Sequence, residues 1–163
     1  MKNLIHLCIL LAAINLGMLS PAIADAIRQG AEHCVVNVRH DDPLNLRSAP
    51  NAAARMLSTL PYATCGVIVT GHCRGNWCPV EDGHFAGWVH RHYIAAISGQ
   101  KHCVTSVDGA ALQVWPSSRS RTLTRLPTNL CELILLPYSV EGWRKVRAGG
   151  WEGWLPSSTI APR

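Results

Sequence analysis

The chain repeats itself at a fixed offset of 66 residues, and this repeat constrains its fold more than any other feature. The match runs without a gap from Asp42 over Asp108 to Ala95 over Ala161. Identical pairs include Leu46/Leu112, Pro50/Pro116, Leu60/Leu126, Cys65/Cys131, Trp77/Trp143, Gly87/Gly153 and Trp88/Trp154. Cys34 also corresponds to Cys103 if the first copy is allowed a few extra residues before Asp42. We therefore expect two copies of one structural unit, residues 34–97 and 103–161, joined by a linker at 98–101.

Each copy has the pattern of short β-strands and turns. Alternating or β-branched segments predict strands at 34–38, 44–47, 65–70, 77–80 and 85–89 in the first copy, and residues 52–57 are interpreted as a loop. No segment shows a sustained helical period, so no helix is expected to cover a sheet. Short strands without such a cover hide their edges by closing on themselves. We therefore predict an all-β chain with one small barrel in each copy.

The motifs of the first copy resemble the bacterial SH3-like domain family. They are Leu44-Asn45-Leu46-Arg47-Ser48-Ala49-Pro50, Gly75-Asn76-Trp77 and Gly87-Trp88-Val89 followed by Tyr93-Ile94. The second copy is similar through Leu112, Pro116, Gly142-Trp143 and Gly153-Trp154, but has Gln113-Val114-Trp115 where the family has an arginine-serine turn. The resemblance implies a tandem of two small SH3-like barrels. It also implies a module that binds cell-wall polymers or peptides without catalysis.

Residues 1–24 have the pattern of a secretory signal peptide. Lys2 precedes an apolar run at 4–16, and Ala22-Ile23-Ala24 is a small-residue cleavage site. An uncleaved membrane anchor is the alternative, but the apolar run is short for a span and Ser20-Pro21 follows it. We expect cleavage after Ala24, no stable membrane span in the remaining chain, and a periplasmic or secreted monomer.

Six cysteines remain after that cleavage, which suits a compartment where disulfides persist. Six cysteines allow 15 connectivities. Cys34 and Cys65 occupy the places of Cys103 and Cys131, whereas Cys73 and Cys78 have no counterparts in the second copy. The repeat therefore favours the pairs Cys34–Cys65, Cys73–Cys78 and Cys103–Cys131.

The alternative for Cys73 and Cys78, which have no counterparts in the second copy, is a zinc site that they would form with His72 and His84. The loose spacing of Cys73 and Cys78 and an oxidising compartment favour the disulfide. We accordingly expect no metal and no other cofactor.

Aromatic residues that do not recur between the copies are the better candidates for ligand contact. The recurring pairs Trp77/Trp143 and Trp88/Trp154 are expected to pack the two barrel cores. The non-recurring aromatics can stack on sugar rings or proline-rich peptides, or they can cover core edges and the junction between the barrels. Two arginines are added because residues 103–163 include seven basic residues against four acidic ones, with Arg144, Lys145 and Arg147 on or beside one strand. The binding candidates are Tyr62, Tyr93, Trp115, Tyr138, Trp151, Arg144 and Arg147.

No catalytic constellation appears in the sequence, and no dedicated nucleic-acid motif does either. The expected function is therefore a non-catalytic binding module that recognises peptidoglycan or another cell-wall component through aromatics near the inter-repeat groove. A protein-interaction or regulatory module that docks on a cell-envelope protein is the alternative. Metal or stress sensing by the Cys and His residues of the first copy is a third and weaker hypothesis.

Overall fold

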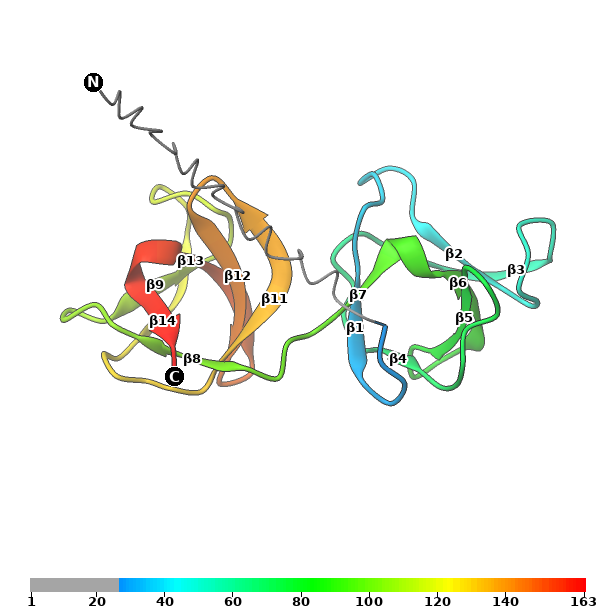
Figure 1. Ribbon diagram of the computed structural model, residues 1–163. Helices are drawn as coiled ribbons and strands as arrows, with labels where there is room; N and C mark the ends of the chain where they lie inside the picture. Colours follow the sequence, from blue (N-terminus) through cyan, green and yellow to red (C-terminus); the bar gives the residue numbers. More distant parts are fainter. Residues whose placement is uncertain (1–26) are drawn as a thin grey trace, which may run out of the picture.

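The computed structural model describes residues 27–163, so the expected signal peptide lies outside the described residues. Fourteen strands form two seven-stranded antiparallel sheets, which Figure 1 shows as two units side by side, joined by a segment between β7 and β8. We call them the first barrel (β1–β7) and the second barrel (β8–β14). Within residues 27–163, no helix is long and apolar enough to cross a membrane.

The two sheets have the same strand order. The order is β3-β2-β6-β5-β4-β1-β7 in the first sheet and β10-β9-β13-β12-β11-β8-β14 in the second. The number of each strand in the second barrel is therefore seven higher than that of its counterpart in the first. The strands of the first barrel are β1 (Glu32–Val35), β2 (Leu44–Arg47), β3 (Met56–Leu60), β4 (Val67–Val69), β5 (Trp77–Glu81), β6 (Ala86–His90) and β7 (Ile94–Ala96). Those of the second are β8 (Lys101–Val104), β9 (Ala110–Gln113), β10 (Thr122–Leu126), β11 (Leu133–Val140), β12 (Trp143–Ala148), β13 (Trp151–Pro156) and β14 (Ile160–Pro162). Short 3-10 helices, η1 (Arg91–Tyr93) and η2 (Ser157–Thr159), precede β7 and β14.

The all-β prediction is confirmed, but the expected strand number was wrong. The structure adds β3 and β7 to the five strands expected in the first barrel. β3 begins inside the segment interpreted as a loop and is an edge strand, paired only with β2. Its sequence, Met-Leu-Ser-Thr-Leu, does not alternate, and only its last residue is buried. Pairing with the preceding strand β2 therefore defines β3, and the pattern of its own residues does not predict it.

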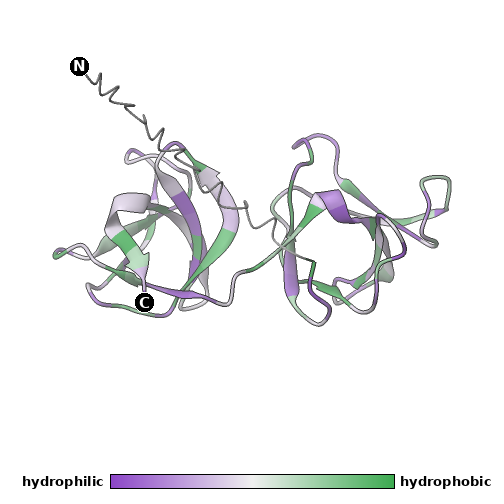
Figure 2. Cartoon of the chain, in the orientation of Figure 1, coloured by the Kyte–Doolittle hydropathy of each residue, from purple (hydrophilic) through white to green (hydrophobic). Residues whose placement is uncertain are grey.

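Aliphatic side chains, not tryptophans, fill the two cores. The first core includes Val35, Leu46, Val67, Val80 and Val89, and the second includes Val104, Leu112, Leu133, Val146 and Leu155. Trp77, Trp88, Trp143 and Trp154 are only half-buried, so the expectation that they pack the cores was wrong. Alternation along a strand explains this, because Val89 and Leu155 follow Trp88 and Trp154 and take the inward positions. Figure 2 shows hydrophobic and hydrophilic segments following one another along the strands.

The recurring glycine at Gly87 and Gly153 has a steric cause. A Cβ added at Gly87 would lie 2.7 Å from the carbonyl oxygen of Arg47, and one added at Gly153 would lie 2.7 Å from that of Gln113. Arg47 and Gln113 are themselves 66 residues apart. The same close approach of β6 to β2, and of β13 to β9, is therefore built into both barrels.

Three disulfides staple the structure, and they are the pairs that the repeat favours. Cys34–Cys65 links β1 to the segment before β4, and Cys103–Cys131 makes the same link in the second barrel. Cys73–Cys78 closes the hairpin between β4 and β5. The thiols required by the zinc alternative are thus consumed at Cys73 and Cys78. Within residues 27–163, no group of three or more His, Cys, Asp or Glu side chains is arranged to hold a metal ion.

Candidate functional site

The first barrel carries a pocket of about 350 Å³ between the end of β6, the start of β5 and strand β2. We call it the Trp77 pocket. One side is aromatic and comes from β5, β6 and η1. The other side is mostly polar and comes from β2 and the segment before it. The lining residues are Asn37, Val38, Arg39, Asp42, Pro43, Leu44, Asn45, Arg47, Ala52, Trp77, His90 and Tyr93.

The aromatic side is held in place by strand pairing and by a local cap. Trp77 and His90 are directly paired partners on β5 and β6, and their rings meet edge-on with centroids 5.5 Å apart. The His90 ring also lies 5.7 Å from that of Tyr93, and its Nδ1 accepts a hydrogen bond of 3.3 Å from the backbone N–H of His92. That bond caps η1 and fixes Tyr93 next to His90. Three aromatic rings from separate elements are thus preorganised as one surface.

The polar side offers both donors and acceptors. Asn45 and Arg47 project from β2, and the Arg47 guanidinium donates 2.9 Å to the carbonyl of Ala54 in the following loop. Asn37 has a left-handed backbone conformation (φ 57°), and its side-chain amide donates 2.9 Å to the carbonyl of His92. Asp42 adds a carboxylate. An aromatic surface facing amide, guanidinium and carboxylate groups suits a ligand with flat apolar faces and many polar edges.

The second barrel does not reproduce this chemistry. At the offset of 66, His90 and Tyr93 become Pro156 and Thr159, and Asn45 and Arg47 become Ala111 and Gln113. Trp143 takes the place of Trp77 and is paired with Pro156, as Trp77 is with His90. Only the tryptophan of the aromatic surface is kept, so the Trp77 pocket is a property of the first barrel.

The predicted binding residues lie in five separate places. Tyr93 is the one that lines the Trp77 pocket. Trp115, in the loop between β9 and β10, is 69% exposed, and Trp151, at the start of β13, is 49% exposed. Phe85, the counterpart of Trp151 in the first copy, is similarly exposed at 50%.

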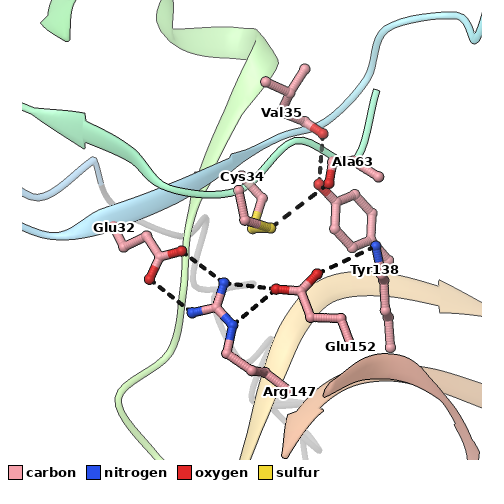
Figure 3. The surroundings of a disulfide bond; sticks show 9 residues. Glu32, Cys34, Val35, Ala63, Tyr138, Arg147 and Glu152 are labelled. Carbon is pink, nitrogen blue, oxygen red and sulfur yellow. Dashed lines mark hydrogen bonds and ion pairs between the residues drawn. A yellow bond between two sulfur atoms is a disulfide. The ribbon is translucent and has the colours of Figure 1, made fainter. Parts of the chain in front are cut away.

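Tyr138 and Arg147 of the second barrel contact residues of the first barrel, as Figure 3 shows, and Tyr62 of the first barrel packs against Tyr138; we call this contact the junction. The rings of Tyr62 and Tyr138 pack edge-on with centroids 5.4 Å apart. The Tyr138 hydroxyl donates 2.8 Å to the carbonyl oxygen of Val35 on β1, and its burial raises the pKa of that hydroxyl. Buried Cys34 and Leu136 belong to the same cluster. The structure therefore places these three candidates in a contact between the barrels.

Arg147 is the polar centre of the junction. Its two terminal nitrogens donate 2.8 and 2.9 Å to the two oxygens of Glu32 in the first barrel, and its Nε donates 2.9 Å to Glu152. Hydrogen bonding to Arg147 holds the pKa of Glu32 below its usual value. Lys145 also lies 3.8 Å from Glu152, and burial lowers its pKa. The two acids thus neutralise much of the positive charge of β12 at this point.

Arg144, the seventh candidate, lies elsewhere. It lines two hollows between the barrels that neither Lys145 nor Arg147 lines. Sequence reasoning missed Trp77, His90, Asn45 and Arg47 as pocket residues. For His90, Asn45 and Arg47, the available signal was the loss of these side chains at the matching positions of the second copy.

Comparison with known proteins agrees with this fold. Residues 42–95 match the family model described as the bacterial SH3 domain. The matched range runs from the loop before β2 to β7 and includes most of the Trp77 pocket. This part of the first barrel is therefore similar to the bacterial SH3 domain.

Two solved structures from Trichomonas vaginalis, NlpC2 and NlpC1, are also similar to the chain. Sequence identity is 15% and 16%, and the TM-score is 0.40 for both. The similarity covers 85% and 86% of this chain but 49% of each of theirs, so the chain spans about half their length. No curated protein matches the chain.

Proposed function

We propose that this protein is an exported, non-catalytic binding module that recognises peptidoglycan, or another cell-wall component, through the Trp77 pocket. The observation that carries the proposal is the preorganised aromatic surface of Trp77, His90 and Tyr93 facing the polar groups of β2. Sugar rings present apolar faces that stack on aromatic rings, and their hydroxyl and amide edges need donors and acceptors. The pocket offers both within one bacterial SH3 domain.

Three further features support export and a binding role. Three disulfides consume all six cysteines from Cys34 onward, which fits an oxidising compartment and leaves none of these thiols as a nucleophile. Without the expected signal peptide, which contains Lys2, the chain has 14 Lys and Arg against 10 Asp and Glu, and this net charge of +4 favours anionic polymers. Most of the pocket lies within residues 42–95, and their similarity to the bacterial SH3 domain, which is typically a binding domain, supports a binding role.

Co-sedimentation with purified peptidoglycan tests the proposal. The protein would be the oxidised chain from Asp25 onward, compared with Trp77→Ala and with Asn45→Ala, which changes the polar side of the pocket and leaves its aromatic rings in place. We expect each substitution to weaken retention several-fold, because stacking and hydrogen-bonded contacts are each worth about 1 kcal/mol. The matched control is Trp115→Ala, which removes a tryptophan outside the pocket and should bind like the parent. Equal retention of the parent and both pocket variants would contradict the proposal.

A second candidate function is docking on a cell-envelope protein. The exposed Trp115 and Trp151 of the second barrel favour it, because large exposed aromatics are enriched at protein interfaces. This reading predicts no retention on peptidoglycan, and capture of one envelope protein that Trp115→Ala and Trp151→Ala abolish and Asn45→Ala leaves intact.

A further inference from the structure

Arg144 differs from the other basic residues of β12 in having no hydrogen-bond or ion-pair partner among residues 27–163. Arg147 donates to two carboxylates and Lys145 lies beside one of them. The Nε of Arg144 is shielded from solvent, yet no acceptor within residues 27–163 lies in hydrogen-bond reach. A guanidinium donor held away from water without an acceptor is costly. Among the described residues, Arg144 also lacks the carboxylate partner that Lys145 and Arg147 have, and a bound anion would supply one to the part of the guanidinium that reaches the groove.

Arg144 stands between two hollows that separate the barrels. One has a volume of about 480 Å³ and the other about 230 Å³, and both are lined by Arg144 and Pro137. We call the two together the inter-barrel groove. Its walls come from strand β7 and the linker on one side and from strand β11 on the other. It therefore exists only because the junction holds the two barrels together.

The groove has a one-sided electrostatic character. No Asp or Glu is among the residues that line either hollow. Arg144 brings the one permanent charge, and the imidazoles of His92 and His102 line one hollow each. Ser98, Gln100 and Ser139 add neutral polar groups, while Ala95, Ala96 and Pro137 add small apolar surface.

We infer that the inter-barrel groove binds the carboxylate of a peptide-like ligand, with Arg144 as the anion-binding residue. A planar guanidinium matches a carboxylate in a two-point hydrogen bond. A single permanent charge favours a monoanion over a doubly charged phosphate. The small apolar surface beside Arg144 suits a short side chain such as that of alanine next to the carboxylate. Asn37 lines both the larger hollow and the Trp77 pocket, but Arg144 does not line that pocket, so the binding proposed at Arg144 does not depend on what the Trp77 pocket binds.

The test uses a pair of probes that differ only in charge. N-acetylalanine carries a terminal carboxylate, and N-acetylalaninamide has the same stem with a neutral amide in its place. Each is titrated into the oxidised chain from Asp25 onward, and NMR follows the Arg144 Nε–Hε resonance and the backbone amides of 94–102 and 135–139. We expect saturable shifts at these positions with N-acetylalanine and none with the amide.

Variants separate the site from general charge attraction. Arg144→Gln should weaken N-acetylalanine binding about tenfold or more, because a hydrogen bond to a charged group is worth a factor of that size. Arg144→Lys keeps the charge without the planar fork and should give an intermediate affinity. Arg119→Gln is the matched control, since it removes an exposed arginine of the same barrel outside the groove, and it should leave binding unchanged.

Three results would overturn the inference. The first is a linear or absent shift of the Arg144 Nε–Hε resonance with N-acetylalanine. The second is equal binding by the parent and Arg144→Gln when both give the same amide spectrum outside the groove. The third is tighter binding of inorganic phosphate than of N-acetylalanine, which would make the groove a phosphate site. Retention of N-acetylalanine binding by Trp77→Ala would show that the groove acts independently of the Trp77 pocket, and its loss would refute that independence.

Discussion

The ion pair between Glu32 and Arg147 is expected to tie the two barrels together thermodynamically. The guanidinium makes two parallel hydrogen bonds, of 2.8 and 2.9 Å, to a carboxylate of the other barrel. The two side chains are only 30% and 29% exposed. Exposed pairs contribute about 0.2–1 kcal/mol, and a hydrogen bond to a charged group about 1.5–3 kcal/mol. After discounting for the remaining exposure, we expect a coupling free energy of about 1–2 kcal/mol.

A double-mutant cycle measures this coupling. Glu32→Gln, Arg147→Gln and the double variant would be compared with the parent by urea unfolding of the oxidised protein at pH 7. Arg147→Gln also removes the contact with Glu152, but it does so whether position 32 is Glu or Gln. That loss therefore cancels in the cycle, which isolates the inter-barrel pair. The exposed pair Lys101 and Glu132, within the second barrel, is the matched control and should couple by less than about 0.5 kcal/mol.

The coupling should also depend on pH in a defined direction. The pKa of Glu32 is lowered in the folded protein by its hydrogen bonds to Arg147. The stabilisation is therefore complete above the usual pKa of 4.5 and is lost as pH falls through the lowered folded value. A coupling at pH 7 no larger than that of the control pair, or one that does not shrink at pH 3, would refute the reasoning.

Three other perturbations have clear expected results. Burial lowers the pKa of His33, whose Nδ1 lies 2.9 Å from the Ala31 carbonyl, so the free energy of unfolding should fall as pH drops below the usual pKa of 6.5. The urea midpoint should therefore fall less between pH 7 and pH 5 for His33→Gln than for the parent, and an equal fall would contradict this. Replacing both cysteines of Cys73–Cys78 by serine should lower the free energy of unfolding by about 2 kcal/mol, and the same change at Cys34–Cys65 by about 4 kcal/mol, because the two disulfides close loops of 5 and 31 residues. Equal losses in chemical denaturation would argue against loop closure as the cause. Gly87→Ala should lower the melting temperature clearly, because the added Cβ would clash with the Arg47 carbonyl oxygen. Gly99→Ala should not, because a Cβ at Gly99 has no atom within 4 Å, and similar melting curves for the two variants would show that β6 and β2 can move apart.

The repeat carried most of what could be predicted of the fold. A fixed offset reports equivalent positions directly, so it indicated two similar units and the pairing of Cys34 with Cys65 and of Cys103 with Cys131. It also misled at the tryptophans, because recurrence shows that a position matters to the unit but not which way its side chain points. Trp88 is half-buried beside Arg74, whose guanidinium lies 5.2 Å from the ring centroid, and the inward position belongs to Val89.

The candidate site was harder to predict, for physical reasons. From the sequence, Tyr138 and Arg147 were interpreted as candidates for an exposed binding surface. Only the relative orientation of the two barrels shows that Tyr138 contacts Val35 and that Arg147 contacts Glu32. The Trp77 pocket joins β2, β5 and η1, which are neighbours only after the sheet has closed. Tyr93 was identified because it fails to recur, and the same comparison applied to His90 would have indicated the rest of the aromatic surface.

The most direct measurement of the central claim is NMR mapping of soluble peptidoglycan fragments on the isotopically labelled, oxidised chain from Asp25 onward. The account predicts saturable shifts at the indole N–H of Trp77 and at the amides of Asn45, His90 and Tyr93, with the indole N–H groups of Trp115 and Trp151 unmoved. Shifts centred on Trp115 and Trp151, or no saturable shift anywhere on the first barrel, would contradict it.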